Sequence, residues 1–135
     1  MTKSLERIEG IGKKYAVKLK NAGIRGPRML LSKGLSSQGR KEIAKKAGVS
    51  DKLVLEWVNH CDLFRVKGVG SEYADLLEAA GVDTVPELGK RNPENLHSSI
   101  IEANNKKKLV RKIPTNKQVK DWVSQAKRLP RKIEY

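Results

Sequence analysis

Two short glycine turns hold the residues best suited to bind an anion, and the first is Gly10-Ile11-Gly12, followed by Lys13 and Lys14. Glycine lacks a side chain and readily adopts positive φ angles, so such a turn can leave backbone N–H groups facing outward where a helix begins. The start of a helix has unpaired N–H donors and a partial positive charge, and both suit a phosphate group. Contacts of this kind position a nucleic-acid backbone and do not read its base sequence. The pattern therefore predicts a phosphate-binding turn at positions 10–14.

The second turn has different flanking charges. It runs from Gly68 to Gly70 and is followed by Glu72, a carboxylate that would satisfy the helix dipole and repel a phosphate. Lys67 and Arg65 offset part of this repulsion. We therefore expect the first turn to hold phosphate and the second to be mainly structural or to make a weaker contact.

The chain is strongly basic, but its charges are unevenly distributed. It has 29 lysines and arginines against 15 acidic residues, a formal net charge of +14. Residues 1–62 carry 14 basic and 6 acidic side chains (net +8), residues 63–105 carry 4 and 7 (net −3), and residues 106–135 carry 11 and 2 (net +9). A protein this basic attracts polyanions, and these are expected to prefer the two ends of the chain.

Further basic residues are candidates for the same contacts. Lys20, Arg25 and Arg28 extend the first turn, whereas the basic residues of segment 40–46, Arg40 included, fit an ordinary solvent-facing surface equally well. The candidate phosphate contacts outside the turns are Lys18, Lys106, Lys107, Lys108, Arg111 and Lys112.

The chain repeats itself. Residues 8–24 align with residues 66–82 without gaps, and the segment 56–58 matches the segment 121–123. A unit of about 60 residues is therefore duplicated, and the second copy is longer near residues 106–112.

Each copy is predicted to form helices separated by short turns. Apolar residues recur at helical spacing, with Ser, Thr, Asn or Pro at the expected starts and Gly at several expected ends. No segment alternates apolar and polar residues, so no sheet is expected. The helices are expected from Gly12 to Ala22, from Pro27 to Leu31, from Ser37 to Ala47, after Ser50, after Thr84, from Pro93 to about Asn105, and from Thr115 to before Pro130.

The pattern apolar-x-Gly-apolar-Gly-x-x-x-Ala-x-x-Leu occurs in both copies and resembles the helix-hairpin-helix motif. Over nearly its whole length the chain resembles a family of uncharacterised bacterial proteins with two such motifs, most specifically in residues 57–70. The motif is also similar to that in the C-terminal domain of RNA polymerase α subunits, which contacts DNA. The resemblance implies an all-helical fold and supplies no catalytic residues. We therefore expect an all-α protein of two tandem helix-hairpin-helix units packed together, a basic one over residues 1–62 and a second over residues 63–135 with a basic C-terminal segment.

A competing motif lies in residues 42–50, which look like the first helix and turn of a helix-turn-helix repressor. The following helix would then present polar residues to a major groove. It instead carries Val54, Trp57 and Val58, which are core residue types, so sequence-specific readout is disfavoured.

No catalytic or metal site is expected. Asp75 and Glu78 lie one turn apart on an expected helix and fit a solvated face. His60, Cys61 and Asp62 are consecutive, so on a helix their side chains point in different directions and cannot form a triad. Because the chain has a single cysteine, it cannot form an internal disulfide. No apolar run approaches the roughly 18 residues that a membrane helix needs.

The sequence therefore predicts a non-enzymatic nucleic-acid-binding protein without a cofactor, with duplex DNA as the favoured partner. The alternatives are a protein-interaction scaffold that docks through the acidic residues 72–94 and an RNA- or ribosome-binding protein. The aromatic content of 4% argues against stacking on single strands. The N-terminus does not resemble a signal peptide, so we expect a cytoplasmic protein, associated with the nucleoid if it is bacterial.

Overall fold

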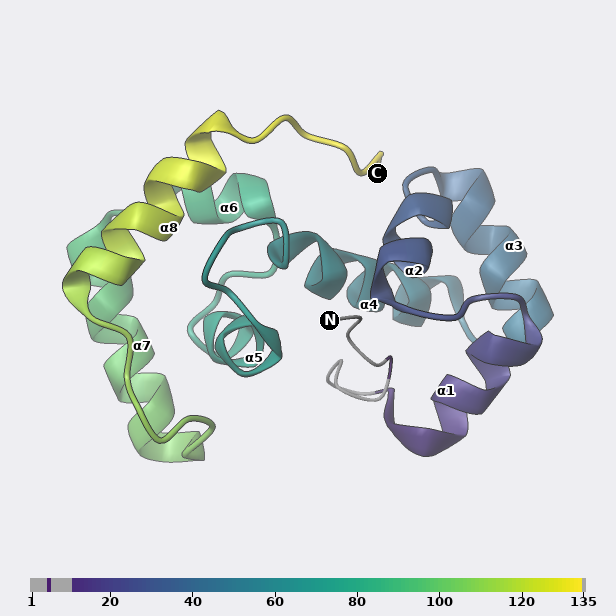
Figure 1. Ribbon diagram of the computed structural model, residues 1–135, viewed down its shortest axis with the longest axis horizontal. Coiled ribbons are helices and arrows are strands. Elements are labelled where there is room, and N and C mark those ends of the chain that lie inside the picture. The colour runs from purple at the N-terminus through teal and green to yellow at the C-terminus, as the bar shows by residue number, and fades with distance from the viewer. Residues whose placement is uncertain (1–4, 6–10, 135) are drawn as a thin grey trace. The chain divides into compact units, whose positions relative to one another are not determined.

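A computed structural model of the chain describes residues 5 and 11–134, and these residues form helices joined by turns and loops (Figure 1). No strand occurs among them, which confirms the all-helical fold. The helices are α1 (Gly12–Asn21), α2 (Pro27–Lys33), α3 (Ser37–Ala47), α4 (Asp51–Leu63), α5 (Ser71–Ala79), α6 (Val85–Lys90), α7 (Pro93–Lys107) and α8 (Asn116–Arg128).

The chain divides into two compact units. The first comprises residues 1–62 and 132–135, and the second comprises residues 63–131. Residues 132–134 group with the first unit and not with the second. Within the first unit, the Glu134 N–H donates to the carbonyl oxygen of Leu35 at 2.7 Å. Arg40 donates to the carbonyl oxygens of Gly34, at 2.9 Å, and Glu134. Arg40 is buried, so its expected place on a solvent-facing surface is wrong.

Local capping groups set the helix ends. The Ser36 hydroxyl accepts from the Gly39 N–H at 3.0 Å, and Thr84, Asn92 and Thr115 cap α6, α7 and α8 in the same way. These caps confirm the predicted starts, because a side-chain oxygen near a helix start satisfies N–H groups that have no partner within the helix. At the other end, Gly48 adopts a left-handed conformation after α3, as the sequence predicts.

The same aromatic pair appears in both units. The ring centres of Tyr15 and Trp57 lie 5.3 Å apart in the first unit, and those of Tyr73 and Trp122 lie 5.2 Å apart in the second. Both tryptophans are buried. The first helix of each unit is thus packed through a tyrosine against the last helix of that unit.

In the second unit, α8 supplies much of the core. It packs against α6 and α7, which runs beside it in Figure 1. Four residues at helical spacing face this core, as predicted: Val119, Trp122, Val123 and Ala126.

Trp122 also packs against the turn before α5. Gly68 has a φ of +95°, and a Cβ added there would lie 3.0 Å from Nε1 of Trp122. Gly81, after α5, has nearly the same φ of +96°, but a Cβ there would meet only the flexible end of Arg91 at 3.7 Å.

These two glycines allow conformational strain to be separated from crowding. We expect Gly81→Ala to lower the free energy of unfolding by about 1–2 kcal/mol, the cost of a Cβ in the left-handed region. Gly68→Ala should cost about 1 kcal/mol more, because Trp122 must also shift. Urea denaturation of the two variants measures the difference. Equal losses would show that α8 does not crowd this turn.

Candidate nucleic-acid interface

The first predicted binding turn is described only from Ile11 onward, so Gly10 lies outside the described residues. Ile11 is buried and anchors the start of α1. Gly12 is the first residue of α1 and has a φ of +56°, and a Cβ added there would meet no described atom within 4 Å. Among the described residues, none therefore occupies the side of Gly12 where a Cβ would point, and the same holds for Gly70 in the second turn.

The first turn of α1 carries positive charge and no carboxylate. This turn has no acidic residue, and Ile11, which precedes it, has no polar side chain to cap the N–H groups. Lys13 and Lys14 are both exposed. A helix start of this kind attracts an anion through its N–H groups and dipole, and the two lysines add to that attraction.

Lys18 continues this basic side of α1. It lies four residues after Lys14, so the two lysines share one face of the helix. Its Nζ atom lies 5.7 Å from the centre of the Tyr15 ring, a cation–π contact that positions the ammonium group. The Tyr15 ring in turn packs against Trp57, so Lys18 is held against the core of the unit.

A second basic cluster of the first unit lies on α2. Arg25, Arg28 and Lys33 line a hollow of about 440 Å³, together with Met29 and Ser32. The sequence indicates the two arginines but not Lys33. Lys33 lies five residues after Arg28, and this spacing does not place two residues on the same face of a helix, so no local pattern indicates it.

The second glycine turn contacts α8 at Lys67 and Gly68. The Lys67 N–H donates to Oε1 of Gln125 at 2.8 Å, and Nε2 of Gln125 donates back to the Lys67 carbonyl oxygen at 3.1 Å. Gly68 lies against Trp122. The backbone of Lys67 is therefore already paired, whereas its side chain is exposed. Gly70 precedes α5, whose first turn contains the carboxylate of Glu72.

The predicted basic run forms the end of α7 and the loop that follows. Lys106 and Lys107 lie in the last turn of α7, and Arg111 and Lys112 lie in the loop; all four are exposed. Nζ of Lys106 lies 3.6 Å from Oε1 of Glu102, but exposed ion pairs of this kind contribute little to stability.

Lys108 occupies the position where α7 ends, with a φ of +50°, and no other non-glycine residue among those described has a positive φ. The equivalent position at the end of α3 is Gly48, with a φ of +70°. The left-handed region is unfavourable for a residue with a Cβ. The second unit therefore has a lysine where the first has the conformationally suited glycine.

Hydrogen bonds from uncharged side chains hold this basic loop in place. The side chain of Asn104 donates to the Val110 carbonyl oxygen at 3.1 Å and accepts from the Val110 N–H at 3.0 Å. The Tyr73 hydroxyl donates to the Lys112 carbonyl oxygen at 3.1 Å, and Nε2 of His97 lies 2.8 Å from the carbonyl oxygen of Pro114. The loop is thus tied to α7 and to α5.

The loop and the start of α5 enclose a hollow of about 680 Å³, which we call the α5–loop hollow. Its lining includes Glu72 and Tyr73 from α5 and the cations Lys108, Arg111 and Lys112 from the loop. Two groups that the sequence places far apart, the helix after the second glycine turn and the basic run, are therefore neighbours within one unit.

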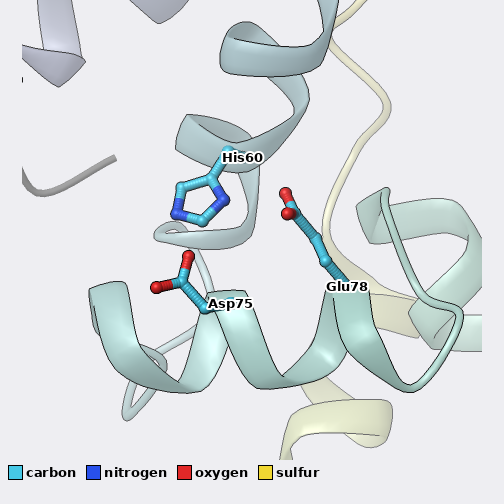
Figure 2. A group of neighbouring side chains, drawn as sticks. All are labelled: His60, Asp75 and Glu78. Atoms are coloured by element: carbon cyan, nitrogen blue, oxygen red, sulfur yellow. The ribbon is translucent and has the colours of Figure 1, made fainter. Parts of the chain in front are cut away.

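Two further groups of chemically reactive side chains lie outside these basic surfaces. Figure 2 shows the side chains of Asp75 and Glu78 on the same side of α5, and it also labels His60 of α4, which belongs to the first unit. Both carboxylates are partly buried, so their expected place on a solvated face is wrong. His60, Cys61 and Asp62 are buried near the end of α4.

Comparison with known proteins identifies one family. Residues 9–129 match the family model described as "Domain of unknown function (DUF4332)". No curated protein and no solved structure matches the chain. Among the described residues, no helix is both long enough and apolar enough to cross a membrane.

The conformation of Lys108 gives a test by stability. Lys108→Gly should raise the free energy of unfolding by about 0.5–1 kcal/mol, because glycine removes the left-handed strain. Lys107→Gly removes the same charge but places glycine within α7, so it should lower the free energy by up to about 1 kcal/mol. Urea denaturation of both variants checks the two signs. A loss of stability in Lys108→Gly would contradict the strain at this position.

Proposed function

We propose that this chain, which belongs to the DUF4332 family, binds the backbone of double-stranded nucleic acid, with duplex DNA as the favoured partner, and is a binding module and not an enzyme. The observation that carries the proposal is the start of α1. It combines an exposed Gly12, no carboxylate in the first turn of the helix, and the exposed Lys13 and Lys14. A phosphate would find N–H donors and two cations on the same helix turn.

We further infer that each unit is a helix-hairpin-helix domain. Three features support this. Within the described part of the chain, each unit has four helices in the same order, a buried apolar residue between its two glycines, and a tyrosine–tryptophan pair. The two turns then differ in role: Gln125 occupies the backbone of the second turn at Lys67, and the first turn makes the principal phosphate contact.

The distribution of charge supports a polyanionic partner for both units. The first unit carries 15 basic and 7 acidic residues (net +8), and the second carries 14 and 8 (net +6). In the second unit, Lys106 and Lys107 are exposed at the end of α7 and available for outer contacts with the backbone.

The aromatic residues favour a duplex over a single strand. Single strands are bound largely by stacking bases on exposed aromatic rings. Trp57 and Trp122 are buried, and Tyr15 and Tyr73 pack against them. The two tryptophans are therefore engaged in the core, and packing against them reduces the ring surface that each tyrosine offers to a base.

Replacing Lys13 by Gln tests the phosphate contact at α1. The variant should bind duplexes of different sequence several-fold more weakly and to the same extent. The slope of log affinity against log salt should fall by about one, because one fewer counterion is released. Lys45→Gln, which removes an exposed charge from α3, is the matched control and should change neither quantity appreciably. Fluorescence anisotropy across a salt series measures both.

Two results would contradict the proposal. One is an affinity for duplex DNA that does not change with salt. The other is an equal effect of Lys13→Gln and Lys45→Gln, which would mean that binding follows net charge and not the helix start. Competition with single-stranded DNA and duplex RNA then identifies the preferred nucleic acid.

A further inference from the structure

We propose that the α5–loop hollow of the second unit is a binding site for a small phosphate-bearing ligand of mononucleotide size. The inference goes beyond backbone binding, because the hollow lies in another unit from the α1 turn and uses a different set of residues. It rests on the size of the hollow, its charges and the way in which its cations are held.

The size of the hollow suits such a ligand. Sites for small molecules usually have volumes of about 300–1,000 Å³, and this hollow has about 680 Å³. Its lining is mixed in character, with charged and polar side chains beside the apolar Leu109 and Val110. An aromatic or sugar ring and a phosphate could therefore both find suitable surroundings.

The charges of the hollow favour one phosphate group over a long polyanion. Lys108, Arg111 and Lys112 stand against the single carboxylate of Glu72. A guanidinium group binds phosphate through two parallel hydrogen bonds, and the two ammonium groups add attraction from several directions. Glu72 repels additional phosphates but accepts hydrogen bonds from hydroxyl or amino groups, and Asn105 provides a donor and an acceptor.

The cations of the hollow are held on a fixed loop. Asn104 forms two hydrogen bonds with Val110, and Tyr73 donates to Lys112. These contacts hold the backbone on both sides of Arg111. A ligand then binds without the cost of ordering the loop, which lowers affinity at flexible sites.

The backbone conformation of Lys108 also supports a ligand site, independently of the size and charge of the hollow. A non-glycine residue in the left-handed region is costly and often marks a site where function requires the side chain. Gly48 shows that the same helix end is made with glycine in the first unit. The side chain of Lys108 lines the hollow, and binding an anion there accounts for its presence.

Calorimetry on the full chain tests the site with defined probes: the four nucleoside 5′-monophosphates, adenosine and inorganic phosphate. We expect at least one monophosphate to bind with one-to-one stoichiometry, and adenosine to bind at least tenfold more weakly. Arg111→Gln should weaken monophosphate binding at least tenfold. Lys107→Gln is the matched control, because Lys107 is exposed nearby but does not line the hollow, and it should change affinity less than twofold.

Lys13→Gln distinguishes monophosphate binding in the hollow from duplex binding at α1. Lys13→Gln should weaken duplex binding and leave monophosphate binding unchanged. Competition by an oligonucleotide with a 5′-phosphate, but not by its 5′-hydroxyl form, would support the site and identify a strand end as the source of the phosphate. Three results would overturn it: no saturable binding of any monophosphate, equal binding of adenosine, or equal losses in Arg111→Gln and Lys107→Gln.

Discussion

The start of a helix has a partial positive charge, and the charged groups around this start differ between α1 and α5. Before α5, Gln125 pairs with the backbone of Lys67, and Glu72 places a carboxylate in the first helical turn. The start of α1 has no acidic residue in its first turn and is flanked by Lys13 and Lys14. The positive end of the helix dipole thus has a carboxylate beside it in α5 and two lysines beside it in α1, although the two helices have nearly the same sequence pattern.

Concentrated positive charge imposes a second constraint on the fold. Five cations lie between residues 106 and 112, and their mutual repulsion opposes a compact loop. Ion pairs do little against it, since the pair of Lys106 with Glu102 is exposed. The loop is held instead by the neutral side chains Asn104 and Tyr73, which bond its backbone and leave its cations facing outward. These neutral side chains hold the loop without cancelling its positive charge, whereas carboxylates would cancel it.

The sequence predicts features of this fold that depend on near neighbours. Caps such as Ser36 and end glycines such as Gly48 act within a few residues, so the helix bounds follow from the sequence. It does not predict contacts between distant residues. Arg40 is buried because it bonds the backbone of Glu134, 94 residues away, and the α5–loop hollow depends on a hydrogen bond between Tyr73 and Lys112. Hydrophobic periodicity contains no information on such pairs.

The duplication explains how one fold came to present two different surfaces. Between α3 and α4 the first unit has only a short turn after Gly48, whereas the second unit has a longer α7 and a loop that begins at Lys108. The additional stretch is rich in basic residues, and three of them, Lys108, Arg111 and Lys112, border the hollow beside α5. The core is unaffected, because the tyrosine–tryptophan pair has nearly the same ring separation in both units. An insertion at a helix end can therefore add a charged site without repacking the helices, since loops tolerate added length at little cost in stability.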